Sequence, residues 1–181
     1  MTALADHNSL ALDTDRLRLI ACTAPIAKAL TLGKRRAETR LGMRLAPDYP
    51  SINIRNYLPF YASHLEGDPS ELGWGIWLIV QADERAVIGD VGFKGRPQRG
   101  GSVDIGYGIA PAYRGQGYAY EAAYALRNWA FQQPEVERIT ADCLVDNHAS
   151  ARILQKLGMQ RTGHAPTGLL LWEMRREHLE R

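Results

Sequence analysis

The sequence predicts an α+β domain in which helices cover both faces of a mixed, mostly antiparallel central sheet. Residues 75–110 hold three β-branched and aromatic runs separated by short polar turns, which is typical of an antiparallel meander. Residues 102–145 then follow the order strand, helix, strand, and such a unit carries its two strands parallel. The two patterns together predict a mixed sheet.

The chain begins with a polar stretch that shows no periodicity. We therefore expect residues 1–11 to form a flexible tail. Residues 12–181 are expected to form a single domain, because a chain of 181 residues is long enough for one sizeable core and short for two. Leu17 and Leu19 alternate with arginines, as a half-buried first strand requires.

Helical patterns follow this strand. Residues 25–44 carry spaced apolar side chains interrupted by Gly33 and Gly42, which predicts one or two short helices. Residues 54–65 place apolar side chains at helical spacing. Pro59 lies inside that pattern and could set a helix start, since proline fits the first helical turn.

The rest of the chain is expected to alternate strands and helices. The last helix opens at Asp146 or Asn147 as N-cap, and Gly158 fits the left-handed position that commonly closes a helix. The predicted strands cover residues 75–81, 86–95, 102–110, 138–145 and 168–174, and the predicted helices cover 118–132 and 147–157.

Composition limits the functional classes. Apolar residues make up 45% of the chain and charged residues 23%, a mixture typical of a globular protein, and the net charge of +2 gives no general attraction to nucleic acid or an anionic membrane. No apolar run is long enough for a membrane span and no secretory pattern opens the chain, so a cytoplasmic protein is expected. Cys22 and Cys143 lie in strand-like contexts and are interpreted as buried apolar residues, so no disulfide and no metal site is expected.

The stretch "IAPAYRGQGYAYEAA" joins a strand to an alanine-rich helix. The start of a helix presents unpaired backbone amides and a partial positive charge, which together attract anions. Gly115 and Gly117 leave room for a phosphate to approach the backbone, and Arg114 adds a fixed positive charge. The stretch therefore predicts a phosphate-binding turn, with an ordinary glycine-containing connection as the alternative.

Two common phosphate loops are excluded by the residues that follow Gly117. A Walker loop needs lysine and a hydroxyl residue after its last glycine, where this chain has Tyr118 and Ala119. A dinucleotide loop needs a third glycine at the position of Tyr120. A plain nucleotide-binding domain is therefore disfavoured.

The order of these segments resembles the GNAT acetyltransferase superfamily, and the resemblance spans most of the chain. The family's pyrophosphate loop, Arg/Gln-x-x-Gly-x-Gly/Ala, matches residues 114–119, "RGQGYA". "IGYGIAPAYRGQGYAYEA", "NHASARILQKLGM" and "LLLW" are similar to the branch that contains ribosomal-protein N-terminal acetyltransferases.

This resemblance implies acetyl-CoA as cosubstrate. The residues it implies for binding are Ile109, Arg114, Gly115, Gln116, Gly117, Tyr118, Ala119, Asn147 and Arg152. Ile109 would pair its backbone with the pantetheine arm and polarise the thioester carbonyl. Asn147 is equally explained as a helix N-cap, and Arg152 as part of a solvated helix face.

Two residues are candidates for catalysis. Asp104 matches the position of a base glutamate in some family members, but an extended strand would separate it from Ile109 by roughly 17 Å; the alternative is an aspartate that is paired with an arginine or solvated at the start of a strand. Many relatives protonate the thiolate with a tyrosine where this chain has Leu154. Ser150, on the margin of an apolar face formed by Ala149, Ile153 and Leu157, could donate toward the thiol or bond locally.

The sequence thus predicts an N-acetyltransferase in which a primary amine attacks acetyl-CoA directly. The acceptor is expected to be a protein N-terminus or a small-molecule amine, with no nucleic-acid or membrane partner, and a homodimer is compatible with the sequence. The alternative function is a non-catalytic acyl-CoA-binding regulator, which the missing helix tyrosine motivates. Tyr57, Tyr61, Trp74 and Trp77 could line an acceptor groove or belong to the core.

Overall fold

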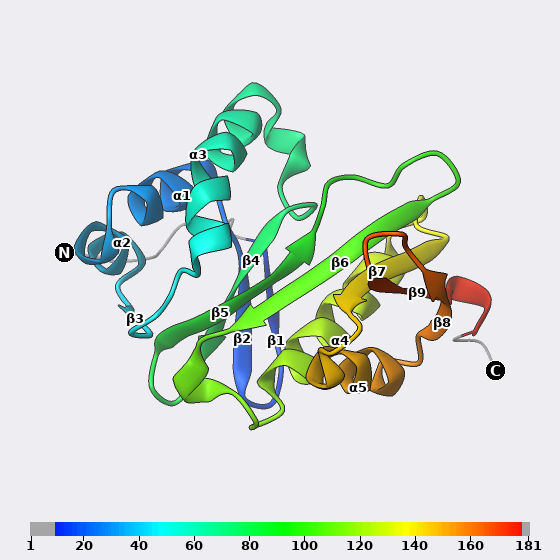
Figure 1. Ribbon diagram of the computed structural model, residues 1–181. Helices are drawn as coiled ribbons and strands as arrows, with labels where there is room; N and C mark the ends of the chain where they lie inside the picture. The colour runs from blue at the N-terminus through cyan, green and yellow to red at the C-terminus, as the bar shows by residue number, and fades with distance from the viewer. Residues whose placement is uncertain (1–9, 179–181) are drawn as a thin grey trace.

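The computed structural model describes residues 10–178, and within that range the strands form one nine-stranded sheet (Figure 1). Its strand order is β1-β2-β4-β5-β6-β7-β9-β8, with β3 attached to β5. The strands are β1 Ala11–Asp13, β2 Leu17–Ala21, β3 Arg44–Leu45, β4 Ile76–Gln81, β5 Ala86–Phe93, β6 Ser102–Ile109, β7 Arg138–Leu144, β8 Gln160–His164 and β9 Leu169–Arg175. Most neighbours are antiparallel, so the predicted α+β fold class is confirmed.

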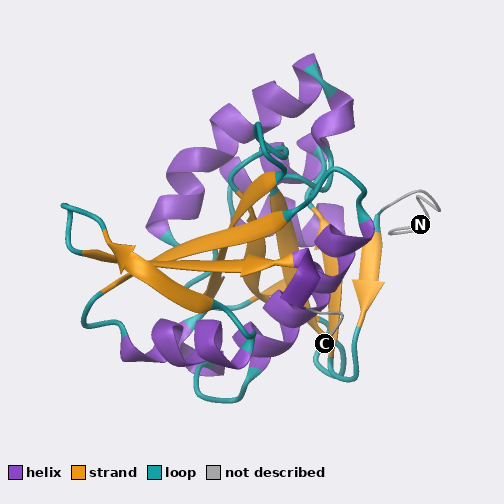
Figure 2. Ribbon diagram, turned by 90° about the vertical axis from the view of Figure 1, so that its right-hand side faces the viewer, coloured by secondary structure: helices purple, strands orange, loops and turns teal. Residues whose placement is uncertain are grey.

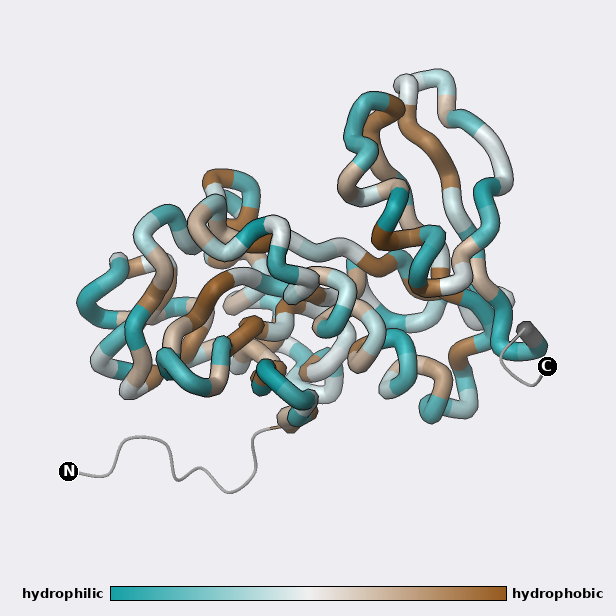
Figure 3. The backbone as a smooth tube through the Cα atoms, turned by 90° about the horizontal axis from the view of Figure 1, so that it is seen from below, coloured by the Kyte–Doolittle hydropathy of each residue, from teal (hydrophilic) through white to brown (hydrophobic). Residues whose placement is uncertain are grey.

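Helices cover both faces of this sheet (Figure 2). The α-helices are α1 Ala24–Thr31, α2 Lys34–Leu41, α3 Ile52–Gly67, α4 Tyr118–Gln132 and α5 His148–Lys156, and short 3-10 turns cover Pro69–Glu71, Pro111–Tyr113 and Arg176–His178. Leu126 of α4 and Leu154 of α5 belong to one buried cluster, whereas Ile26 of α1 and Leu58 of α3 belong to another. The sheet therefore separates two apolar cores, with the hydrophilic segments mainly in outer turns and on outer helix surfaces (Figure 3).

The N-terminal strand was missed by the sequence analysis. Most of the predicted tail, residues 1–11, lies outside the described residues, but Ala11 opens β1 and pairs with Ile20 of β2. The Leu10 carbonyl also accepts a hydrogen bond of 2.9 Å from the Ala21 amide. Regular structure therefore starts before residue 12. Strand β1 was not predicted because three residues show too little alternation of apolar and polar side chains to be recognised in the sequence.

The interpretation of Pro59 as a helix start was wrong. Pro59 lies inside α3, and the helix begins after Ser51, whose hydroxyl accepts a hydrogen bond from the Ile54 amide at 3.4 Å. Gly33 and Gly42 do separate and end short helices, and Gly42 adopts φ 64°, a left-handed conformation that glycine reaches without steric cost. The short strands β3 and β8 were not predicted either.

The strand–helix–strand unit forms as predicted. Helix α4 connects β6 to β7, and the two strands pair in parallel from Ser102 opposite Arg138 to Asp104 opposite Thr140. The register stops there, although β6 continues to Ile109. In Figure 1 the two strands start side by side and separate toward the α5 end of the molecule. The second half of β6 therefore has a free edge.

Aromatic side chains fill the core near α4. Trp129 lies within 5.3 Å of both Trp74 and Trp77, measured between ring centroids. Cys22 and Cys143 are buried free thiols, which confirms their interpretation as small apolar residues. The predicted closing strand forms as β9, and its full pairing with β7 places Leu170 and Trp172 in the core.

Candidate active site

The turn before α4, residues 114–119, presents backbone amides to the outside of the molecule. Gly115 and Gly117 adopt φ values of 74° and 85°, a region that other residues enter at a steric cost. The first backbone bond inside α4 runs from the Glu121 amide to the Gly117 carbonyl, and Gly117 caps the helix without a side-chain bond. No residue among 10–178 accepts a hydrogen bond from the amides of Gly115 to Ala119. Unpaired amides of this kind are the groups that an anion contacts at a helix start.

Arg114 links this turn to the end of β6. Its Nε donates a hydrogen bond of 2.9 Å to the Ile109 carbonyl, and the rest of the exposed guanidinium remains directed to solvent. The bond fixes the side chain beside the strand end, and terminal nitrogens stay available for an anion. Among the residues predicted to bind phosphate, Arg114 and the amides of 115–119 are therefore brought together.

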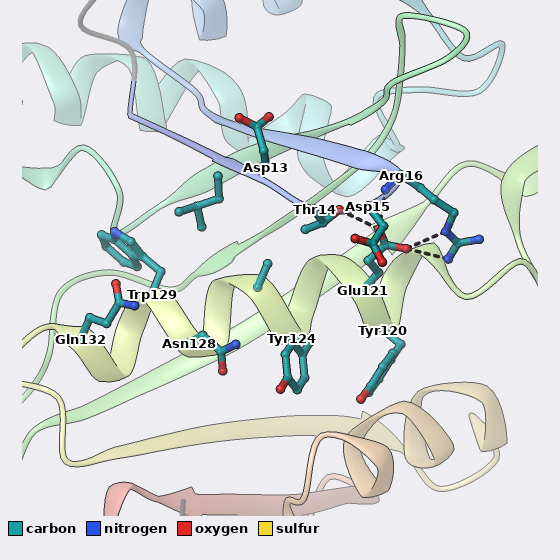
Figure 4. A pocket seen from close by; sticks show the side chains of 12 residues that line it. Asp13, Thr14, Asp15, Arg16, Tyr120, Glu121, Tyr124, Asn128, Trp129 and Gln132 are labelled. Atoms are coloured by element: carbon teal, nitrogen blue, oxygen red, sulfur yellow. Dashed lines mark hydrogen bonds and ion pairs between the residues drawn. The ribbon is translucent and has the colours of Figure 1, made fainter.

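Arg16, at the end of the β1–β2 turn, supports the same loop from the other side (Figure 4). Its Nη1 donates to the Gln116 carbonyl at 3.0 Å, and its guanidinium lies 4.6 Å above the centre of the Tyr118 ring. Arg16 Nη2 is 2.6 Å from the Glu121 carboxylate, which also accepts a bond from the Thr14 hydroxyl. The sequence analysis had not found this contact, because residues 16 and 121 are far apart along the chain.

These bonds also keep Glu121 ionised. Burial alone would raise the pKa of its carboxyl, but hydrogen bonds from Thr14 and Arg16 hold that pKa below its ordinary value. A carboxylate in the first turn of α4 also complements the helix dipole. Thr14, Arg16 and Glu121 lie along a cavity of about 700 Å³ between the β1–β2 turn and α4.

The free edge of β6 carries unpaired backbone groups. The Asp104 carbonyl and the Ala110 amide bond toward the β5 side, and alternate residues of a strand direct their polar groups to opposite edges. Tyr107 and Ile109 therefore direct theirs to the edge that β7 has left, where the Ile109 carbonyl already accepts the hydrogen bond from Arg114 Nε. A Cβ added to Gly106 would meet nothing within 4 Å, so the face of β6 is open at this position.

Helix α5 starts beside that edge. Asn147 caps it, and its Oδ1 accepts a hydrogen bond of 3.1 Å from the Ser150 amide, so the structural alternative for Asn147 is observed. The Tyr107 hydroxyl donates to the Ser150 carbonyl at 3.3 Å. Burial raises the pKa of Tyr107 to about 12, which keeps the phenol protonated. Tyr107 of β6 and Ser150 of α5 are therefore in direct contact.

The predicted apolar face of α5 was partly wrong. Ala149 is exposed, whereas Leu154 is 1% exposed and packs in the core with Leu157. The helix is therefore rotated so that Leu154 faces inward and Ser150 stands at the edge of the buried surface. Arg152 is exposed on α5.

Asp104 takes part in an ion-pair network. Lys94 Nζ is 2.8 Å from the carboxylate of Asp104 and 2.8 Å from that of Asp142, and Thr140 Oγ1 donates to Asp104 at 3.2 Å. Burial alone would lower the pKa of Lys94, but these two carboxylates hold that pKa above its ordinary value. The paired alternative for Asp104 is thus the observed arrangement, and a free base is not.

A groove on the face of the sheet opposite α4 and α5 was not predicted. This α3 groove, of about 730 Å³, is lined by α3, β4, β5 and β6, and Asp90 lies in it. Burial raises the pKa of the Asp90 carboxyl to about 7. The single acidic residue within "AVIGDVGF" was the available sequence signal, but the pattern could not show which face of the sheet it occupies.

The four aromatic residues considered for an acceptor groove divide between two locations. Tyr57 lines the α3 groove. Tyr61 is buried and donates to the Cys22 carbonyl at 2.9 Å, and Trp74 and Trp77 belong to the core on the α4 side. The core alternative was therefore right for three of the four.

The described residues show neither a metal-binding cluster nor a membrane-spanning helix. Among residues 10–178, no group of three or more His, Cys, Asp or Glu side chains is arranged to hold a metal ion. Within the same range, no helix combines the length and the apolar character that crossing a membrane would require.

Comparison with known proteins adds independent evidence. Residues 16–160 match the family model described as an acetyltransferase (GNAT) domain. The chain is 34% identical over 147 residues to the "Uncharacterized N-acetyltransferase YjdG" of Bacillus subtilis (strain 168), a match that covers 81% of this chain and 88% of that protein. It is 29% identical over 103 residues to the "[Ribosomal protein uS5]-alanine N-acetyltransferase" of Escherichia coli (strain K12), covering 56% of this chain and 53% of that protein.

A solved structure shares the fold. "RimL- Ribosomal L7/L12 alpha-N-protein acetyltransferase in complex with Coenzyme A" superposes with a TM-score of 0.68 at 16% sequence identity, covering 92% of this chain and 98% of that chain.

Proposed function

Because the chain belongs to the GNAT acetyltransferase family, in the branch of the ribosomal-protein N-terminal acetyltransferases, we propose that it moves an acetyl group from acetyl-CoA to a primary amine. The observation that carries this proposal is the row of unpaired amides from Gly115 to Ala119, beside the Arg114 guanidinium. Several amides acting together with one arginine are needed, since a single exposed helix terminus contributes only about 0.3–1 kcal/mol.

The residues present fit the cosubstrate. The amides of residues 115–119 and Arg114 would hold the pyrophosphate, and the free edge of β6 at Tyr107 and Ile109 would pair with the pantetheine arm. Asn147 would contribute the part of its amide that the cap leaves free, and exposed Arg152 would reach the ribose phosphate. Bound there, acetyl-CoA supplies an acetyl group activated as a thioester.

The chain's own groups supply the remaining chemistry. The Ile109 amide, at the free edge, would donate a hydrogen bond to the developing oxyanion. The hydroxyl of Ser150 would support the departing sulfur, and Tyr107, whose hydroxyl donates to the Ser150 carbonyl, would hold Ser150 in place. Asp104 is held by Lys94 and Thr140, so we assign it a structural role, in stabilising the contact between β6 and β7, and not a role in proton transfer.

The acceptor in this proposal is a protein N-terminus or a small amine. The names of the matched ribosomal-protein acetyltransferases favour a peptide. An α-amino group has a reference pKa near 8 and is substantially neutral at physiological pH, whereas lysine, near 10.4, is almost fully protonated. An N-terminal amine therefore depends less on an enzymatic base to remove its proton.

Two measurements test this function in sequence. Thermal-shift titrations with acetyl-CoA, CoA and ATP should show stabilisation by the first two and none by ATP, because the 114–119 loop lacks the Walker lysine. Thiol release is then followed with an alanine-start peptide, phenylalaninamide and spermidine. Stabilisation by CoA without any amine-stimulated release would favour the alternative, a non-catalytic acyl-CoA-binding regulator, which the buried Leu154 in place of a helix tyrosine supports.

A further inference from the structure

The α3 groove reaches the free edge of β6 from the face opposite α4 and α5. Asp90 on β5 stands directly across from Gly108 on β6. A Cβ added to Gly108 would lie 4.0 Å from the Asp90 Oδ1, so the carboxyl is placed over the glycine backbone. Tyr107 and Ile109, the neighbours of Gly108, carry the backbone groups proposed to hold the thioester arm. The carboxyl therefore lies one strand away from that arm.

No described residue neutralises this carboxylate. Within residues 10–178, no side chain forms an ion pair with Asp90 and none donates a hydrogen bond to it. The nearby Tyr49 hydroxyl is buried and also has no hydrogen-bond partner in that range. Asp90 is half-buried in the groove, and a partly desolvated carboxylate without a protein partner is a candidate for contact with a cationic ligand.

The other titratable groups around Asp90 do not supply a cation. Burial first, and then the Asp90 charge, raise the pKa of both the Cys22 thiol and the Tyr49 hydroxyl, which keeps them neutral. Burial likewise raises the pKa of Tyr57 and of Tyr107, which also line the groove. Lys94 lines it as well, but Asp104 and Asp142 already hold its ammonium.

We propose that the α3 groove binds the acceptor as a primary ammonium attached to an apolar carbon skeleton, and that Asp90 takes the ammonium's proton. This inference rests on the proposed acetyltransferase function and deepens it. An ammonium complements the charge that the unpaired Asp90 carboxylate carries when it is ionised. The apolar skeleton is favoured by the groove wall, where Tyr57 and exposed Phe60 of α3 lie with ring centroids 5.7 Å apart and Ile76 of β4 is a further lining residue.

The proton balance of this step is complete. The ammonium gives one proton to the Asp90 carboxylate and becomes a neutral amine. The amine nitrogen then forms a bond to the acetyl carbon, the carbon–sulfur bond breaks, and the sulfur takes the second proton that the nitrogen loses. Asp90 finally returns its proton to water. A base whose pKa is near neutrality suits this task, because it is ionised at working pH and still accepts a proton readily.

The test compares Asp90→Asn with Asp104→Asn as a matched acid-to-amide control on the neighbouring strand. Acetylation of phenylalaninamide by the full chain is followed by thiol release and mass spectrometry between pH 5.5 and 9.5. For the original protein, kcat/KM should rise as pH passes about 7. For Asp90→Asn, kcat/KM at pH 7 should fall about 10-fold, because only about one α-amino group in ten is neutral there, and should recover toward pH 9.5, where the amine is already neutral.

A CoA titration by thermal shift accompanies each variant and separates structural damage from lost chemistry. Asp90→Asn should bind CoA as the original protein does, since it lies outside the 114–119 loop. If the original protein does not bind CoA, the proposed function itself fails. The inference alone is overturned if Asp90→Asn keeps its activity and pH profile, if Asp104→Asn loses more, or if spermidine is acetylated while phenylalaninamide is not.

Discussion

The 114–119 loop and the α3 groove approach the same strand, β6, from different directions and are built in different ways. The loop is six consecutive residues whose backbone amides do the binding, and its side chains matter mainly at Arg114. The groove joins side chains from α3, β4, β5 and β6, with Asp90 as its charged group. A site made of consecutive backbone groups can be recognised from a short stretch of sequence, whereas a site made of distant side chains needs the fold first.

Breaking the backbone site should have the largest effect. In Gly117→Val a β-branched residue would have to adopt φ near 85°, and its Cβ would lie 3.4 Å from Arg16 Nη2. We expect at least about a 100-fold loss of CoA affinity, because the loop would leave the left-handed conformation that aligns its amides. Isothermal titration measures the change. Gly163→Ala is the control, since Gly163 has open space and an ordinary φ; similar losses in both variants would contradict the role of the loop.

The charge on Asp90 in the α3 groove should make the free energy of unfolding depend on pH. The Asp90 pKa is about 7 in the folded state and 3.8 ordinarily, so the unfolded chain ionises first as pH rises from 4 to 7. The original protein therefore loses stability across that interval, and Asp90→Asn does not. We expect the advantage of Asp90→Asn in unfolding free energy to grow by on the order of 2 kcal/mol between pH 5 and pH 8 and then stay level.

Urea unfolding at pH 5, 8 and 9 measures this advantage. Asp104→Asn is the comparison, because Asp104 is paired with Lys94 and should not gain stability when its charge is removed. A constant difference between Asp90→Asn and the original protein at all three pH values would mean that Asp90 is ionised throughout, as on a solvated surface.

The same contrast explains what the sequence could predict. The meander, the parallel unit and the limits of α4 follow from periodicity and turn residues, and the structure has them where expected. Strand β1 is too short for a period, and Pro59 was misread because the true cap, Ser51, lies eight residues earlier in a stretch with several candidate starts. Residue type alone could not pair Arg16 with Glu121 or place Asp90 beside Gly108, since both contacts depend on how distant strands come together.

Arg16 offers a way to weaken the loop without changing its backbone. Arg16→Ala removes the bond to the Gln116 carbonyl, the contact with the Tyr118 ring and the ion pair with Glu121. We expect a 3- to 10-fold weaker affinity for CoA, or about 1 kcal/mol, because the loop keeps its amides but loses their support. Arg18→Ala is the matched control, since exposed Arg18 meets only Asp13 at 3.8 Å. Equal CoA affinities in the two variants would show that Arg16 does not support the CoA-binding loop.

The smallest effect should come from Ser150 in the first turn of α5. Its amide is held by Asn147 and its carbonyl by the Tyr107 hydroxyl, so Ser150→Ala should leave α5 in place and remove only the hydroxyl. A thiol with a reference pKa near 8.5 departs with little help near neutral pH. We therefore expect kcat to fall 2- to 10-fold in Ser150→Ala, with KM for acetyl-CoA unchanged. Tyr107→Phe removes the bond to the Ser150 carbonyl, so it should have no larger effect than Ser150→Ala, and the double variant should lose little more than Ser150→Ala alone. A loss above 100-fold in Ser150→Ala alone would instead make this serine an essential acid and shift the proton chemistry from the α3 groove to α5.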